Sequence, residues 1–333
     1  MMDIGSPIIH KSRDPMGVKR GSMKRRTLLA SAVTASLASF GSGLLAKVPE
    51  RPRRLSVTPV SFRDWFAQTP KPFTSGRPPA RPMTLGEFPA FAADELGIRE
   101  IELWSVFFED VSPAYCASLR SAARKAGVRV GNIQLDAIDA DLASTDDAVR
   151  ARGIATVKQW MDRAALVGAP RVRANTDQPV SGRPFDPDRI AESFRELARY
   201  GDKVGVDILI ENHTGYSASI ANVIAIHERV GHRRCRLLAD WGNSRAADTD
   251  GRIADLAKMF PDLAFVSAKG MTFDEQYRHS AYDIAAIVRA TEAAGYRGTY
   301  SIELFTMGKA MPEDPVRAVR SMADTITANL ARR

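Results

Sequence analysis

The chain has 333 residues, of which 44% are hydrophobic and 26% are charged, and it carries a formal net charge of +8. This composition is typical of a globular protein with a sizeable core, and no apolar run is long and pure enough to serve as a stable membrane anchor. The first 54 residues hold 11 of the 47 Lys and Arg and 3 of the 39 Asp and Glu, so the rest of the chain has no net charge. The basic character therefore gives no reason to expect a nucleic-acid-binding surface on the folded part.

The N-terminal segment contains a basic run, Met23 to Leu29, which leads into a weakly apolar stretch rich in Ala, Ser and Thr up to Ala46. This pattern looks like a twin-arginine export signal, which implies the twin-arginine export machinery as a partner and a periplasmic location. We therefore expect a leader over residues 1–46, with Met23 as the true start, and a linker over residues 47–54. A disordered basic tail on a cytoplasmic protein is the alternative.

From Leu55 onward, short apolar or β-branched runs alternate with longer amphipathic stretches, which is typical of repeated βα units around a parallel sheet. The strands are expected at 55–60, 100–104, 128–135, 171–175, 207–211, 236–240, 264–269 and 299–304. The helices expected between them include 113–126, 146–167, 187–204, 220–230, 283–294 and 314–330. Eight strands predict one (β/α)8 TIM barrel over residues 55–333, because a doubly wound sheet usually stops at about six strands. The proline-rich segment 68–82 is expected to be an irregular excursion after the first strand.

Three of the predicted strands end on an acid, namely Glu211, Asp240 and Glu303. Active sites of such barrels lie at the C-terminal ends of the strands, so these three acids are candidate active-site residues. A single acid after a strand is commonly a helix N-cap, and this reading stays open for Asp240 alone. Three acids at one barrel mouth repel each other, so a divalent cation or protonation must neutralise them.

The runs 206–213, 240–243, 267–270 and 295–303 resemble the xylose-isomerase-like TIM barrel superfamily, the sugar phosphate isomerase/epimerase family. The resemblance extends from about Leu55 to the C-terminus. It implies a carbohydrate isomerase or epimerase that moves a proton beside a carbonyl group with the help of a bound divalent metal. Glu211 and Glu303 would then be the acid/base pair, and Lys269 would place a positive charge near the developing oxyanion. The alternative for Lys269 is that it only pairs with Glu303 or Asp240.

The resemblance also implies that Glu211, Asp240 and Glu303 are three of four metal ligands. The fourth is missing, because the family pattern His-x-Lys-Asp on the seventh strand has Ser267 in place of the His and Gly270 in place of the Asp, while Lys269 matches the pattern. An all-oxygen ligand set favours manganese or magnesium, with cobalt or zinc as alternatives.

Two histidines are candidates for the missing metal ligand. His213 lies two residues beyond Glu211 and would share its face in a continuing strand, and His279 lies in the long loop after the seventh strand. For both, a surface or hydrogen-bonding histidine is the alternative. The expected substrate-binding wall comprises Glu102, Trp104, Arg173, Asn175 and His213.

Export would favour a free sugar or sugar derivative as the substrate, since phosphorylated sugars are mainly cytoplasmic. Two alternatives remain on the same barrel: a lyase or hydrolase of keto-sugars and keto-glycosides, and a non-catalytic sugar-binding protein. A metal-dependent endonuclease would need more histidines than the domain contains; those present are His213, His227, His232 and His279. The sequence leaves the exact substrate and homo-oligomer formation open.

Overall fold

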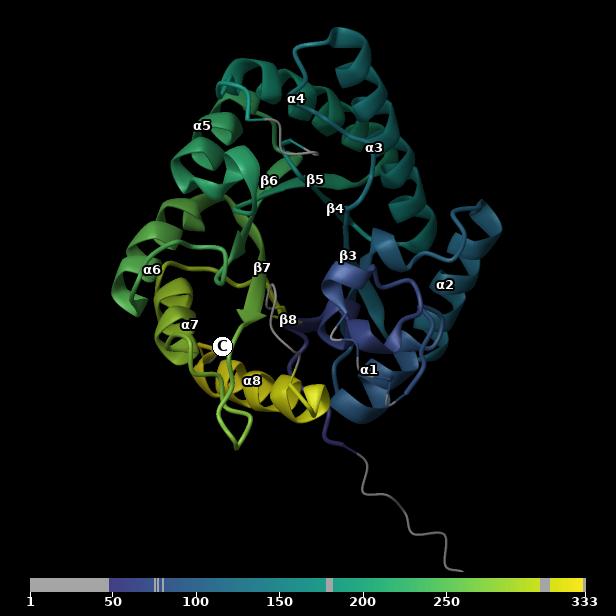
Figure 1. Ribbon diagram of the computed structural model, residues 1–333, viewed down its shortest axis with the longest axis vertical. Coiled ribbons are helices and arrows are strands. Elements are labelled where there is room, and N and C mark those ends of the chain that lie inside the picture. Colours follow the sequence, from purple (N-terminus) through teal and green to yellow (C-terminus); the bar gives the residue numbers. More distant parts are fainter. Residues whose placement is uncertain are drawn as a thin grey trace, which may run out of the picture. The chain divides into compact units, whose positions relative to one another are not determined.

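In the computed structural model, eight parallel strands of the described chain close into a barrel, with the last strand pairing back onto the first (Figure 1). The strands are β1 (Leu55–Val57), β2 (Glu100–Trp104), β3 (Arg129–Gln134), β4 (Arg171–Ala174), β5 (Asp207–Glu211), β6 (Cys235–Asp240), β7 (Leu263–Gly270) and β8 (Thr299–Leu304). The predicted (β/α)8 TIM barrel is therefore confirmed. The structure describes residues 48–74, 76, 78–79, 81–177, 182–305 and 312–331.

The predicted leader, residues 1–46, lies outside the described residues. Within the described part of the chain, no helix combines the length and apolar character needed to cross a bilayer.

The helices form a ring outside the strands (Figure 1). They are α1 (Phe88–Leu96), α2 (Pro113–Lys125), α3 (Asp147–Val167), α4 (Pro187–Val204), α5 (Ile220–Val230), α6 (Thr249–Leu256), α7 (Ile284–Ala293) and α8 (Pro315–Asn329). Each helix from α2 to α8 starts after a Ser or Asp whose side chain accepts a backbone N–H of the first turn. Gly168 and Gly205 end α3 and α4 in the left-handed conformation, which turns the chain toward the next strand.

The first strand is shorter than predicted. β1 ends at Val57 instead of continuing to residue 60, and the chain turns into the 3-10 helix η1 (Pro59–Trp65). Pro59 has no backbone N–H for a strand ladder, and the Thr58 side chain accepts the Val60 N–H, so both residues favour a helical start.

Two apolar clusters fill the fold at different depths. The larger one packs the outer faces of the strands against the helices. The smaller one, Leu209, Leu238 and Phe265, is separate from it and lies on the inward-facing positions of β5, β6 and β7. The next inward positions toward the C-terminal ends of these strands are polar, because side chains alternate along a strand. On the side formed by β5, β6 and β7, the barrel interior thus changes from apolar to polar at this end.

A buried ion pair lies where the barrel closes between β1 and β8. Arg54 Nη1 and Nη2 donate to the two carboxylate oxygens of Glu292 on α7 at 2.8 and 2.6 Å, and Tyr300 Oη donates to Glu292 Oε1 at 2.7 Å. Burial would raise the pKa of Glu292, but these hydrogen bonds outweigh burial and lower it.

We expect Glu292→Gln to reduce the free energy of unfolding by about 2 kcal/mol at neutral pH, since hydrogen bonds to a charged group are lost. A lowered folded-state pKa contributes stability above the unfolded pKa, and that contribution disappears as the pH falls through the folded pKa. The difference between variant and wild type should therefore shrink in acid. Urea unfolding at several pH values measures it, with the exposed Glu228→Gln as the control. Equal stability of Glu292→Gln and wild type at neutral pH would contradict the expectation.

Candidate active site

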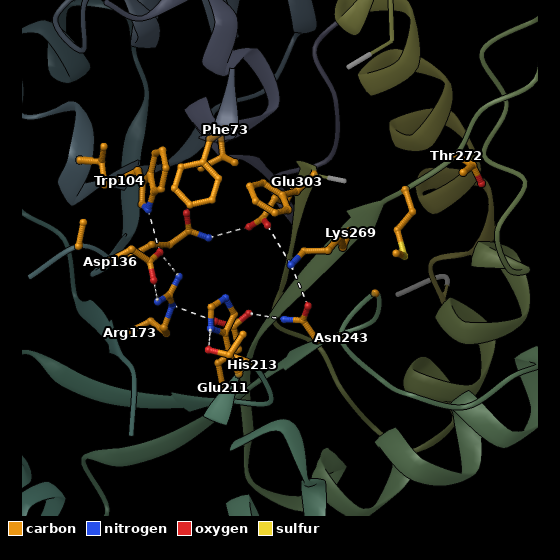
Figure 2. Close-up of a pocket in the computed structure, with 18 residues that line it drawn as sticks. Phe73, Trp104, Asp136, Arg173, Glu211, His213, Asn243, Lys269, Thr272 and Glu303 are labelled. Atoms are coloured by element: carbon orange, nitrogen blue, oxygen red, sulfur yellow. Dashed lines mark hydrogen bonds and ion pairs between the residues drawn. The ribbon is translucent and has the colours of Figure 1, made fainter. Parts of the chain in front are cut away.

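A cavity of about 520 Å³ opens at the C-terminal ends of the strands (Figure 2). Its volume lies in the range of roughly 300–1,000 Å³ that is usual for small-molecule sites. The charged and amide side chains of its wall are Gln134, Asp136, Arg173, Glu211, Asn243, Lys269 and Glu303. Three aromatic rings, Phe73, Trp104 and Phe305, also line it.

The aromatic wall is held from behind by Arg63, which comes from η1 and is buried. Its Nε donates to the carbonyl of Phe73, its Nη1 donates to the carbonyl of Leu304 at 3.0 Å, and its guanidinium lies 4.8 Å from the centre of the Phe305 ring. The 3-10 helix that shortens β1 thus positions two rings of the cavity.

Lys269, near the end of β7, is the centre of one charge cluster. Its ammonium nitrogen lies 2.9 Å from Asp240 Oδ2, 3.2 Å from Glu303 Oε1 and 3.1 Å from Asn243 Oδ1. Burial would lower the pKa of Lys269, but Asp240, Glu303 and Glu211 outweigh burial and raise it. The ammonium is therefore charged throughout the physiological pH range.

Arg173 on β4 is the centre of a second charge cluster. Its Nε lies 2.9 Å from Glu211 Oε2, and its two terminal nitrogens lie 2.9 and 2.8 Å from the two oxygens of Asp136. Asp136 also accepts hydrogen bonds from Trp104 Nε1 and Asn175 Nδ2, both at 2.8 Å. Burial would raise the pKa of Asp136, but Arg173 outweighs burial and lowers it.

Glu303 at the end of β8 has donors on both carboxylate oxygens. Lys269 reaches Oε1, and Gln134 Nε2 donates to Oε2 at 3.0 Å. The Gln134 carbonyl oxygen in turn accepts from Thr58 Oγ1 at 3.0 Å, which fixes the amide orientation. The carboxylate plane of Glu303 is thus held by β1, β3 and β7 together.

Glu211 and His213 follow each other along the β5 side of the cavity. Burial raises the pKa of Glu211 well above its ordinary value, with Asp240 and Glu303 adding to the effect and Arg173 opposing it. Burial, and then Arg173, lower the pKa of His213 to about 4. Its imidazole is therefore neutral at neutral pH and can accept or donate a hydrogen bond.

Glu102 lies inside the barrel below the cavity and is fully buried. Asn132 Nδ2 donates to its Oε2 at 2.7 Å. Burial raises the pKa of Glu102 from 4.5 to about 7. This carboxyl group does not form part of the substrate-binding wall, because Trp104, two residues further along β2, occupies the level of the cavity.

The raised pKa of Glu102 predicts a stability that falls as the pH rises. Between pH 4.5, its ordinary pKa, and about pH 7, the folded protein binds a proton that the unfolded chain has released. The free energy of unfolding should therefore lose about 3 kcal/mol from this group over that window. Glu102→Gln keeps a neutral side chain of similar shape, so we expect it to gain stability over wild type as the pH rises. Urea unfolding of both proteins measures this, and a pH-independent difference would refute it.

The residues present do not fit a resident divalent cation. Each of the three carboxylates expected as ligands already has a side-chain cation within 3.2 Å, Glu211 through Arg173 and the other two through Lys269. Among the described residues, no group of three or more His, Cys, Asp or Glu is arranged to hold a metal ion.

Neither candidate for the missing ligand completes a metal site. His213 lines the cavity but belongs to no such group. His279 Nδ1 donates to the carbonyl of Tyr282 at 3.1 Å, its ring packs 4.4 Å from the Tyr282 ring, and it is not part of the cavity wall. Ser267 is fully buried on β7, and within the described part of the chain its hydroxyl has no hydrogen-bond partner.

The structure brings most of the residues predicted from the sequence to one place. Those that line the cavity are Glu211, Glu303, Lys269, Trp104, Arg173 and His213. Asp240 lies behind Lys269, and Asn175 supports Asp136 without lining the cavity.

Sequence reasoning missed several residues of the wall. Gln134 ends β3 and Asp136 follows it, so the rule that singled out the three acids could have found both. Asn243 lies in the turn after Asp240, which the resemblance had marked. Phe73 carries no such signal, because it lies in the irregular segment after β1.

Comparisons with known proteins agree with this geometry. The family model for the xylose isomerase-like TIM barrel matches residues 90–326. A solved L-ribulose 3-epimerase superposes with a TM-score of 0.67 and 19% identity, covering 84% of this chain and 95% of that chain. A D-allulose 3-epimerase from Methylomonas sp. superposes with a TM-score of 0.64 and 17% identity, covering 84% of this chain and 100% of that chain. A 3-keto-D-glucoside 4-epimerase from E. coli superposes with a TM-score of 0.61 and 14% identity, covering 83% of this chain and 100% of that chain. No curated protein sequence matches the chain.

Proposed function

The chain belongs to the xylose isomerase-like TIM barrel family, and we propose that it is a sugar epimerase or isomerase that moves a proton beside a carbonyl group. The observation that carries this proposal is the pair Glu211 and Glu303, which reach the same cavity from different strands (Figure 2). Moving a proton off one carbon and back onto the substrate needs two such groups. The sugar epimerases among the solved structures with this fold support the same reaction class.

The two carboxyl groups would play different roles at the start of the reaction. Lys269 and Gln134 hold the two carboxylate oxygens of Glu303 in a fixed orientation at the cavity, which suits Glu303 to take a proton from the carbon next to the carbonyl. The C–H electron pair then forms a carbon–carbon double bond, and the carbonyl electron pair moves to oxygen. Burial raises the pKa of Glu211, which suits it to return a proton. Return to the same carbon from the other face gives an epimer. Return to the neighbouring carbon, together with transfer of the hydroxyl proton to the former carbonyl oxygen, gives an isomer.

The substrate that fits this cavity best is an uncharged sugar or sugar derivative. Among the described residues of the wall, the cations are Arg173 and Lys269, and both are paired with carboxylates. The wall therefore offers no excess of positive charge to bind a phosphate group. The aromatic rings offer apolar faces against which the C–H face of a sugar ring can pack, while the amides and carboxylates bind hydroxyl groups.

Hydrogen exchange in deuterated water tests the proposed function. A panel of free ketoses and keto-glycosides is incubated with the enzyme, and mass spectrometry and NMR follow deuterium at the carbon beside the carbonyl. We expect incorporation into at least one sugar together with its epimer or isomer. Release of the aglycone from a keto-glycoside would identify the lyase or hydrolase alternative. Saturable binding without exchange would identify a non-catalytic sugar-binding barrel.

We also propose that the protein is exported by the twin-arginine pathway to the periplasm. The basic run from Met23 to Leu29 and the Ala- and Ser-rich stretch after it support this proposal. N-terminal sequencing of the native protein tests it. A mature chain that starts near Ala46 is expected, and a periplasmic fraction without the protein would contradict it.

A further inference from the structure

We infer that Lys269 supplies the positive charge that a divalent cation supplies in metal-dependent barrels, so that this enzyme works without a resident metal ion. The catalytic part of this inference rests on the proposed function, because the oxygen that gains negative charge during proton transfer needs a cationic partner. The structural part, that the carboxylates bind side-chain cations in place of a metal, stands on its own.

The first argument is the way in which Lys269 joins two of the acids. Its ammonium group contacts Asp240 from β6 and Glu303 from β8 at 2.9 and 3.2 Å. In Figure 2, the ammonium of Lys269 lies among acceptors that come from the neighbouring elements. A divalent ion bound to the same oxygens would have to displace this ammonium or sit beside it, and like charges at such distances repel strongly.

The second argument is that the stem of Lys269 is packed in place. Its side chain is only 6% exposed. A methyl group added at Gly242 would lie 2.7–3.0 Å from Cδ, Cγ and Cβ of Lys269, so the glycine leaves the space that the stem fills. The hydroxyl of Tyr282 donates to the Lys269 carbonyl and fixes the backbone there.

The third argument comes from the residue two positions before Lys269. Ser267 pairs in register with Asp240 and points into the barrel, as Lys269 does. Its hydroxyl is a poor ligand for the ions that imidazole binds. The seventh strand thus contributes an ammonium group to the cluster and no strong metal ligand.

The contacts of Lys269 also show how it can act on a substrate. Its ammonium has three N–H donors, and two of them meet carboxylates. The third donates to the neutral amide oxygen of Asn243, which lines the cavity. A substrate oxygen can replace this amide as the acceptor of the third N–H. The hydrogen bond is weak while that oxygen belongs to a carbonyl group and becomes much stronger when the oxygen is negatively charged, so it stabilises the transition state more than the bound substrate.

Metal content and thermal unfolding test the structural part. Wild-type protein, produced in medium containing Mn²⁺, Co²⁺ and Zn²⁺, should carry far less than one equivalent of metal per chain. Its Tm should not change with EDTA or with millimolar MnCl2, because a ligand that does not bind the folded state cannot stabilise it. One equivalent of metal per chain, removed by EDTA with a fall in Tm, would overturn the inference.

A lysine variant sharpens this test. Lys269→Met keeps the length of the stem but leaves Asp240 and Glu303 without their cation, so Mn²⁺ should now raise its Tm. The matched control is Lys258→Met, whose side chain is 58% exposed and pairs with Asp255 on the surface; it should behave like wild type. A Lys269→Met protein that folds and ignores Mn²⁺ would count against the inference. If Lys269→Met does not fold, the metal content and EDTA response of wild type decide.

Kinetics test the catalytic part once an exchanging sugar is known. EDTA should leave the wild-type rate unchanged, and Lys269→Met should lose about 10²–10³-fold in kcat, as expected for the loss of an oxyanion donor, with a smaller effect on KM. Exchange that stops on chelation would refute this inference while the proposed function stands. Absence of exchange with every sugar would refute the proposed function while the metal result stands.

Discussion

Glu303→Gln is expected to abolish detectable epimerisation and to lower kcat by about 10²–10⁴-fold, since an amide cannot accept the proton that a carboxylate accepts. Gln134 Nε2 or Lys269 Nζ, which bind different oxygens of Glu303 in wild type, can still donate to the amide oxygen, and Lys269 keeps its contact with Asp240. The side chain should therefore stay near its position, and the loss should appear in kcat more than in KM.

The control for Glu303→Gln separates chemistry from folding. Circular dichroism and Tm of the variant should match wild type, and Glu228→Gln on the exposed face of α5 should keep full activity. Deuterium incorporation by Glu303→Gln at the wild-type rate would eliminate Glu303 as the base and leave the site without an assigned proton acceptor.

Arg173→Met is expected to cause the largest loss of stability, about 3–5 kcal/mol of unfolding free energy. The substitution removes the cation that faces both Asp136 and Glu211, and it leaves these two buried or half-buried carboxyl groups without their ion-pair partner. Arg173 is itself almost completely buried, so solvent cannot replace it. Guanidinium chloride unfolding at neutral pH measures the loss.

A second variant shows where the cost of removing Arg173 comes from. Asp136→Asn added to Arg173→Met should recover part of the stability, because one of the unpaired charges is removed. The matched control is Arg233→Met, whose side chain is 72% exposed and pairs with Asp202 on the surface; it should change stability by less than about 1 kcal/mol. A similarly small effect of Arg173→Met would show that the buried ion pairs do not stabilise the fold.

The fold could be predicted from the sequence because its signals are local. The strand at Asp207–Glu211 and the helix at Pro187–Val204 have the predicted bounds, since a short β-branched run and an Asp-capped amphipathic run identify them without their neighbours. The end of β1 could not be predicted from its apolar pattern, because the capping contact of Thr58 and the turn at Pro59 override that pattern.

The site could be predicted only as positions at strand ends. Glu211 and Glu303 each follow an apolar run, so the rule for barrel active sites selects them. The pairing of Lys269 with Glu303 or Asp240 was open as the alternative to an oxyanion role, and Lys269 contacts both acids. The pairing of Arg173 with Asp136 and Glu211 could not be predicted, because the two acids lie on opposite sides of Arg173 and nothing had singled out Asp136. The expectation of a metal came from the three neighbouring acids and from the family resemblance. The packing of the barrel interior, which decides which positive charges lie next to these acids, cannot be predicted from the sequence.

The space that Gly242 leaves for the stem of Lys269 has a consequence for how this enzyme would respond to its surroundings. An ion is bound in proportion to its free concentration, so the active fraction of a metal enzyme rises and falls with supply. An ammonium group attached to the chain and packed against a neighbouring turn has a fixed local concentration in every folded molecule. Folding alone would then complete the electrostatics of the cavity, whether the medium is rich or poor in transition metals.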